Sequence, residues 1–495
     1  MTRLEAFKND LAEWRSFRSG ILLGGGDPPP PPPPAGDMLS GTVSALDLQV
    51  WKSRASFGPY KTFGDVSQNS PGDWDRILAR TATFTANPSF DRAIGPYADG
   101  YTSNPLGSSA SNTMNGTHIY LMCAAFKHLV TNDPTVRDQV KTELLWHFET
   151  GAFRENGPDD FANRTRWPLR IGGDGDPMLP TTTWLVRMAH AYDYLIAADA
   201  AYGTTTFTAS QKSAIEYVLR EGATYFTQDQ DSFLEDIWGS SRYNGTYTTS
   251  MGASYGKIGY YGSKQTGTIH RRYNNRKASA YLAAGTIGTI LDDSFLKGRA
   301  KLYVQECLAY TTFPEGWFGD FERWNTGGTA HHELGWAYAG ILLSLLTGIV
   351  HNLALHGDMS LLTYGTSRGI HGTAATFDKT LLFAMDSFLK YPSDQFTRYG
   401  TDSSANLNLN YRIDGRNPRD GSTWANPADT WIAPLSMWIG GDDQRSIYTR
   451  QRAGMAVYTT GNYGSYPSKG GSGWMGAWSN WPGILFMYGQ REGQY

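Results

Sequence analysis

After about residue 40, apolar residues recur at spacings of three and four, which is typical of helices with one buried face. This pattern predicts helices at residues 116–130, 134–150, 182–201, 209–227, 274–292, 295–311, 329–347 and 373–391. Candidate N-caps stand at the start of three of them, at Thr208, Asn274 and Thr329. Antiparallel helix pairs with long loops between them favour a mainly α protein, an (α/α) toroid or barrel, over a sandwich or a parallel sheet.

The first 38 residues differ from the rest of the chain. Residues 3–18 have the pattern of a short amphipathic helix, followed by three glycines at 24–26 and seven prolines at 28–34. A proline run of this kind forms a stiff polyproline II spacer, and the glycines supply a flexible joint. We interpret residues 1–38 as a tether that docks the body onto a larger assembly; the alternative is a disordered tail.

Residues 39–495 are predicted to form one catalytic domain. A long glycine- and serine-rich segment near residues 90–117 could act as a lid that brings Tyr97 and Tyr101 to a substrate. Beyond about residue 395 the helical pattern fades into an irregular part rich in tryptophan and glycine.

Composition narrows the class of ligand. The net charge of −3 gives no electrostatic reason to expect nucleic acid or an anionic membrane. The 16 Trp, 29 Tyr and 56 Gly favour carbohydrate, because aromatic side chains stack on sugar rings and glycine-rich loops build clefts.

Cysteine usage and hydropathy bear on the protein's surroundings. Cys123 and Cys307 lie in apolar helical contexts, so we expect buried free thiols rather than a disulfide bond. No export signal of the usual kind is visible, and the longest apolar run, Ala337 to Val350, is too short to span a membrane.

Three short stretches carry the candidate chemistry: Tyr273-Asn274-Asn275-Arg276, Phe321-Glu322-Arg323-Trp324 and Ala330-His331-His332-Glu333. Asn275, Arg276 and Arg323 could neutralise the carboxylate of a uronic acid, since the guanidinium fork matches a carboxylate in a bidentate manner. Neutralisation makes the proton at C5 removable by a base and allows the O4 glycosidic oxygen to leave. His331 or His332, in the first turn of a predicted helix, could be that base, because the helix dipole there disfavours imidazolium.

Each of these residues also has a simpler interpretation as a helix cap or a surface charge. A metal site is not predicted, because the His331-His332-Glu333 stretch lacks the spacing of four residues that zinc-binding histidines use on a helix. No cofactor is expected, since phosphate-loop and dinucleotide-binding motifs are absent from the sequence.

The same stretches resemble the alginate lyases of polysaccharide lyase family 5. Asn274-Asn275-Arg276 is similar to the Asn-Asn-His that opens a helix in that family, and Gly316 to Arg323 is similar to its glycine-then-Glu-x-x-Arg segment. The stretch from Ala330 to Tyr338 resembles its Ala-Tyr-His helix, and the segment from Trp184 to Leu195 resembles its Ala-Tyr-Asp helix. Leu361-Leu362-Thr363-Tyr364 before another helix also fits, so the likeness covers roughly residues 90–395.

The resemblance implies an incomplete (α/α) toroid, a deep cleft and metal-free β-elimination. It places Asn275, Arg276 and Arg323 around the carboxylate. The family's histidine is Arg276 here and its catalytic tyrosine is His331, so Tyr338, seven residues later, is a rival for the tyrosine role. The expected substrate contacts are Tyr97, Tyr101, Trp184, Tyr192, Asn274 and Trp324.

The sequence therefore favours a polysaccharide lyase acting on an alginate-like polymer, an exopolysaccharide or a bacterial capsule. The tether and the missing export signal suggest a virion-associated depolymerase, which we expect to be an oligomer attached to phage tail proteins through residues 1–38. Two alternatives remain open: an (α/α)-barrel glycoside hydrolase with carboxylates such as Glu315, Asp320, Glu322 or Glu333, and a non-catalytic polysaccharide-binding virion protein.

Overall fold

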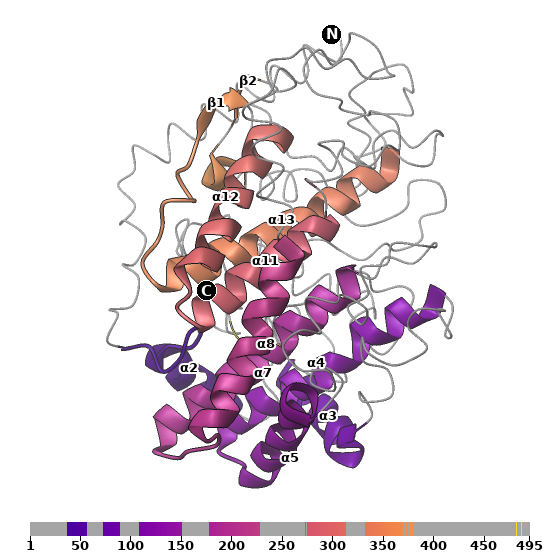
Figure 1. The fold of residues 1–495 in the computed structure, drawn as a ribbon, viewed down its shortest axis with the longest axis vertical. Coiled ribbons are helices and arrows are strands. Elements are labelled where there is room, and N and C mark those ends of the chain that lie inside the picture. The colour runs from indigo at the N-terminus through magenta and orange to yellow at the C-terminus, as the bar shows by residue number, and fades with distance from the viewer. Residues whose placement is uncertain are drawn as a thin grey trace.

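The computed structural model describes residues 37–56, 73–89, 108–150, 178–227, 273, 275–312, 332–369, 372–374, 376–380, 482 and 487 (Figure 1). This part of the chain is mainly helical, as predicted. Its longer helices are α2 (Ala45–Ser56), α3 (Asp73–Ala86), α4 (Ser108–Thr131), α5 (Pro134–Leu145), α7 (Met178–Tyr202), α8 (Ala209–Thr227), α11 (Asn275–Ile290), α12 (Ser294–Thr311) and α13 (His332–Leu355).

Helices α7, α11 and α13 run parallel to one another. Near the starts of α7 and α11, Thr182 hydrogen-bonds to Ser279, and toward their other ends Gly41 contacts both Asp193 of α7 and Ile290 of α11. A methyl group placed on Gly285 of α11 would lie 3.4 Å from Ile349 of α13, and one residue later Thr286 accepts from Asn352 of α13 over 3.0 Å.

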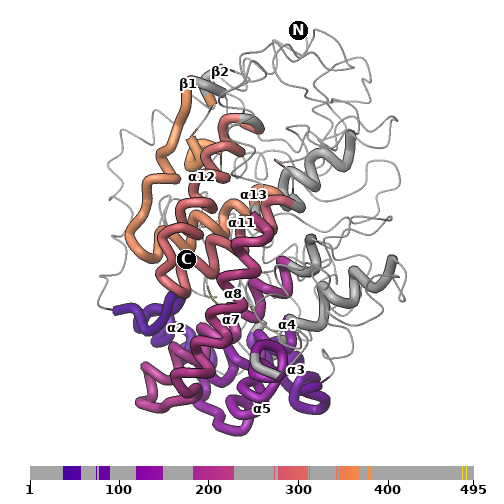
Figure 2. The backbone as a smooth tube through the Cα atoms, in the orientation of Figure 1, coloured from indigo at the N-terminus to yellow at the C-terminus, as the bar shows by residue number. Residues whose placement is uncertain are grey.

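Helix α4 continues this parallel layer on the other side of α7. The rings of Phe126 on α4 and Tyr194 on α7 lie 5.4 Å apart. The Tyr202 hydroxyl of α7 donates to the Leu129 carbonyl of α4 over 2.7 Å, and both of these residues come later in their helices than the two rings. The two helices therefore run in the same direction. Figure 2 shows α7 and α11 in the middle of the described part, where each contacts helices on both sides.

Short turns return the chain beside each of these helices. Residues 132–133 separate α4 from α5, residues 203–208 separate α7 from α8, and residues 291–293 separate α11 from α12. The α11–α12 pair is antiparallel, since Gly285 lies against Ala300 while Gly288 lies against Lys297. One of the predicted antiparallel helix pairs, α11–α12, is therefore present, and short turns also join α4 to α5 and α7 to α8.

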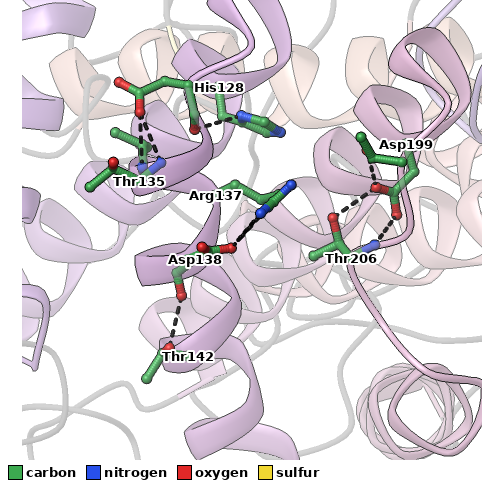
Figure 3. A network of polar contacts seen from close by, with 10 residues as sticks. His128, Thr135, Arg137, Asp138, Thr142, Asp199 and Thr206 are labelled. Atoms are coloured by element: carbon green, nitrogen blue, oxygen red, sulfur yellow. Dashed lines mark hydrogen bonds and ion pairs between the residues drawn. The ribbon is translucent and has the colours of Figure 1, made fainter.

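Side-chain caps close the short turns (Figure 3). Asp133 is the N-cap of α5 and accepts from the amides of Thr135 and Val136 at 3.0 and 3.2 Å. Asp199 accepts from the Thr206 amide and hydroxyl, each at 2.8 Å. These bonds satisfy amides that a helix start or a turn would otherwise leave without partners.

The predicted cap of α8 is also confirmed. The Thr208 hydroxyl accepts from the Gln211 amide over 3.2 Å, and the Gln211 side chain accepts from the Thr208 amide over 3.0 Å. This reciprocal pair is a capping box, for which a threonine followed three residues later by a glutamine is the sequence signal.

Residues 39–44 form a loop that fastens the far ends of the parallel helices, and we call it the clamp loop. Asp193 of α7 accepts from the Gly41 and Thr42 amides at 2.9 Å each and from the Thr42 hydroxyl at 2.5 Å. A side chain at position 41 would collide with the Ile290 backbone at the end of α11. Just beyond α13, His356 Nε2 lies 2.7 Å from the Gly41 carbonyl oxygen.

Residues near the C-terminus close onto the first described helices. The Met487 carbonyl accepts from the Trp51 indole at 3.2 Å and from Arg54 at 2.7 Å. The Pro482 carbonyl accepts from Arg80 of α3 at 3.0 Å. These contacts bring both regions of the sequence into one packed unit.

Three predictions about local structure need correction. Residues 108–117, predicted as the last part of a lid loop, are helical and begin α4. The helix predicted for 373–391 does not begin there: residues 372–374 form a strand, β2 (Gly372–Ala374), paired antiparallel with β1 (Thr366–Gly369), and helix follows at 377–380. The helix predicted for 134–150 is α-helical only to Leu145 and continues as a π-helical turn, η4 (Trp146–Thr150).

Of the predicted tether, residues 1–38, only 37 and 38 are among the described residues, and of the irregular C-terminal part only 482 and 487 are.

Cys123 and Cys307 are both buried and free, as predicted. Among the described helices, none is long and apolar enough to cross a membrane.

Candidate functional site

The candidate catalytic residues lie at the starts of two parallel helices. Asn275 and Arg276 are the first two residues of α11. His332 is the first residue of α13, and Tyr338 lies in its second turn. Tyr97, Tyr101, Asn274, Arg323, Trp324 and His331 lie outside the described residues.

The contacts between α11 and α13 show which of their residues lie at the same height along the two parallel helices. Gly285 lies against Ile349, and Thr286 bonds to Asn352. A residue of α13 therefore has a number 64 (349 − 285) to 66 (352 − 286) higher than the α11 residue beside it. Asn275 is therefore level with residues 339–341. At 1.5 Å per residue, Tyr338 lies about 2–5 Å from that level and His332 about 10–14 Å from it.

The start of α7 reaches the same level. Thr182 bonds to Ser279, an offset of 97 (279 − 182), which places Asn275 level with Met178, the first residue of α7. Helices α7 and α11 thus begin at the same level, and α13 begins about 10–14 Å beyond it. Short turns join the other end of α7 to α8 and the other end of α11 to α12.

A buried tyrosine–glutamate pair lies directly beside the start of α11. Tyr273, two residues before Asn275, donates its hydroxyl to Glu306 of α12 over 3.1 Å. Both residues are about 1% exposed. The Tyr273 ring also lies 5.9 Å from that of Tyr303, which stacks on Tyr281 of α11 at 4.0 Å.

Two residues that we predicted to contact substrate are core residues in this structure. Trp184 is fully buried, with its ring 5.8 Å from Phe148. Tyr192 is 3% exposed, its hydroxyl donates to Glu216 over 2.7 Å, and this burial together with the acceptor raises its pKa far above the usual range. A side chain enclosed in this way has no face on which a sugar ring could stack in this conformation.

The sequence prediction missed a polar layer inside the helix core. His190 of α7 and His351 of α13 are each about 2% exposed, and the His190 ring stacks on Tyr194 at 5.7 Å. Burial lowers the pKa of His190 to about 4, and burial together with repulsion from His190 lowers that of His351 to about 3. Both rings are therefore neutral near pH 7. The available signal was a histidine within an apolar helical run, as in Ala189-His190-Ala191.

This layer lies well away from the helix starts. His190 is level with residue 287 of α11 by the offset of 97, which is 12 residues or about 18 Å from Asn275. The paired imidazoles thus belong to the packed interior rather than to the candidate site. Within the described residues, no group of three or more histidine, cysteine, aspartate or glutamate side chains is arranged to hold a metal ion.

Comparison of the sequence and structure with protein-family models, curated proteins and solved structures finds no match. The resemblance to alginate lyases thus remains a prediction based on the motifs.

Proposed function

We propose that this protein is a polysaccharide lyase that cleaves a uronic acid-containing polymer by β-elimination, with its active site at the starts of α7, α11 and α13. The observation that carries the proposal is the way α11 and α13 lie side by side in the same direction. Asn275 and Arg276 on α11 lie at nearly the same height along the helices as Tyr338 on α13, although more than 60 residues separate them in the sequence.

The proposed architecture is an incomplete (α/α) toroid. In this arrangement α4, α7, α11 and α13 form the inner layer, and α5, α8 and α12 return on the outside. The parallel direction of the first set and the antiparallel α11–α12 pair support it. Such a layer presents all of its helix N-termini at one end, where their dipoles favour an anionic ligand.

In the proposed reaction, Asn275, Arg276 and Arg323 bind the C6 carboxylate and stabilise the negative charge that develops on it. A base removes the proton from C5, the electron pair of that bond forms the C4–C5 double bond, and the C4–O4 bond breaks. An acid then protonates O4 of the departing sugar. The products are a new non-reducing end with a 4,5-unsaturated uronate and a normal reducing end.

Axial register favours Tyr338 over His332 as the base. C5 is bonded directly to the carboxylate carbon, so the base must act within a few ångströms of the residues that bind the carboxylate. Tyr338 lies about 2–5 Å from the level of Asn275, whereas His332 lies about 10–14 Å away. A tyrosinate that takes the proton from C5 becomes a neutral tyrosine, which can then donate that proton to O4 of the departing sugar.

The test is to incubate the protein with alginate, glucuronan, hyaluronan and bacterial capsules and to follow ultraviolet absorbance of the unsaturated product. We expect absorbance to rise on at least one polymer. Tyr338→Phe should lower the rate by roughly a hundredfold or more, as loss of an acid–base group does, while His332→Ala should have less than about a tenth of that effect.

Two outcomes would contradict the proposal. New reducing ends without absorbance would indicate a hydrolase, and no cleavage of any uronate polymer would leave the lyase assignment without support. Equal losses in Tyr338→Phe and His332→Ala would refute the choice of base alone.

A further inference from the structure

The backbone that carries Asn275 and Arg276 is anchored from one side by Tyr273 and Glu306. Tyr273 precedes Asn275 by two residues, and its hydroxyl bonds to Glu306 in the interior, where both side chains are almost completely buried. Glu306 lies near the end of α12, and because α12 is antiparallel to α11, that end is beside the start of α11.

Aromatic packing adds a second contact to the same anchor. Tyr303, one turn before Glu306 on α12, has its ring 5.9 Å from Tyr273 and stacks on Tyr281 at 4.0 Å with an interplanar angle of 7°. Tyr281 lies on α11 itself. The residue before the helix and a residue inside it are therefore held against the same side chain of α12.

A purely apolar core would not need this polar pair. Burying a carboxylate is costly unless it accepts hydrogen bonds, and a phenylalanine at position 273 would pack without any such requirement. Unlike apolar packing, the hydrogen bond between the Tyr273 hydroxyl and the Glu306 carboxylate depends on direction and distance, so it fixes the Tyr273 side chain at one point of α12.

We propose that Tyr273 and Glu306 are a positioning pair that fixes the start of α11 and thereby the place where Asn275 and Arg276 bind the substrate carboxylate. This inference rests on the proposed lyase function. It assigns the pair no contact with substrate. Its effect is on the geometry of the transition state, for which small displacements of binding groups can cost roughly a hundredfold in rate.

The main test compares Tyr273→Phe with a matched control. Tyr273→Phe removes one hydroxyl and keeps the ring. Thr286→Val likewise removes one buried hydroxyl that takes part in a hydrogen bond, with Asn352, but it does so 11 residues further along α11 (286 − 275), about 16 Å from Asn275. We expect Tyr273→Phe to lower kcat by at least about tenfold with little change in KM, and Thr286→Val to leave both nearly unchanged.

Substitutions at Glu306 supply a rescue test. In Glu306→Gln the amide oxygen can still accept from the Tyr273 hydroxyl, so kcat should stay within a few-fold of the parent protein. In Glu306→Leu the acceptor is lost, so kcat should fall as in Tyr273→Phe. Equal kcat values in Glu306→Gln and Glu306→Leu would overturn the positioning role.

Hydrogen exchange of the peptide covering residues 275–283 tests the anchor without any substrate. Tyr273→Phe should accelerate exchange there, and Thr286→Val should not. If the parent protein cleaves no uronate polymer, the proposed function fails, and this exchange difference still decides whether the pair fixes the helix start. Unchanged exchange in Tyr273→Phe, or faster exchange with unchanged kcat, would overturn the inference.

Discussion

Acid should destabilise this protein through the two histidines inside its core, and the effect can be isolated with a single substitution. His190 is buried with its ring stacked on Tyr194, and His351, whose pKa is lowered by burial and by repulsion from His190, is also buried. An unfolded histidine has a pKa near 6.5, whereas that of His190 in the folded protein is about 4. Between these two values the unfolded chain binds a proton that the folded protein does not, so stability falls as pH falls.

The magnitude follows from that difference. At pH 7 about a quarter of the unfolded histidine is protonated and almost none of the folded His190, which costs only about 0.2 kcal/mol. At pH 4.5 the unfolded histidine is almost fully charged while the folded one is mostly neutral, which costs about 2.5 kcal/mol from His190 alone. His351, with a pKa of about 3, adds a loss of the same sign. Together these losses are a large share of a typical folding free energy of about 5–15 kcal/mol.

His190→Leu isolates the effect. Because the Nδ1 atom of His190 is buried and has no hydrogen-bond partner among the described residues, replacing the imidazole with an apolar side chain of similar size should change stability at pH 7 by less than about 1 kcal/mol. Urea unfolding should be measured for both proteins between pH 7 and pH 4.5. The parent protein should lose about 2.5 kcal/mol more than His190→Leu over this range.

The comparison also removes opposing contributions. Burial raises the pKa of Asp193, so the folded protein takes up a proton there before the unfolded chain does, and this contribution to stability grows as pH falls. Because both proteins contain Asp193, its contribution cancels when their changes in unfolding free energy are compared. Parallel unfolding curves for the two proteins would refute the reasoning, since they would mean that His190 does not stay neutral inside the folded protein.

Two further predictions concern stability. Asp193→Ala should lower the free energy of unfolding by roughly 2–4 kcal/mol at pH 7, because it leaves the Gly41 and Thr42 amides of the clamp loop without this acceptor. The matched control is Asp138→Ala, which breaks a surface ion pair with Arg137. In the same urea titration it should lower the free energy of unfolding by less than about 0.5 kcal/mol. Asp133→Ala should cost about 1 kcal/mol through loss of the α5 cap. The Lys127 hydrogen bond lowers the pKa of Asp133, so the Asp133 contribution is present above pH 3.8 and is lost as pH falls further; a thermal shift of Asp133→Ala that is the same at pH 7 and pH 2.5 would argue against it.

Helix periodicity and capping residues were enough to predict most of the described helices. Thr208 shows why: its bond with Gln211 involves residues three apart, so the signal is local and readable in the sequence. The strand at 372–374 was missed because pairing with Thr366–Gly369 decides its conformation, and short strands carry little periodic signal.

The candidate site could be predicted only in part. The sequence placed Asn275 and His332 at helix starts, but it could not give the register between α11 and α13, which depends on contacts such as Thr286 with Asn352 across 66 residues (352 − 286). That register is what distinguishes Tyr338 from His332. Trp184, which we predicted to contact substrate, is buried in the core. The sequence pattern of an aromatic residue on an apolar helix face is the same whether the residue lines a cleft or packs in the core.

The clamp loop has a practical consequence for how the protein could be mounted on a surface. It fastens the N-terminal side of the described chain to Asp193 in the second half of α7, to Ile290 at the end of α11 and to His356 just beyond α13. The start of α11 lies 15 residues from Ile290 (290 − 275), or about 22 Å away along the helix. A bead or a fusion partner joined directly to residue 37, in a protein shortened to begin there, would therefore hold the protein by the end with the short turns, well away from the start of α11.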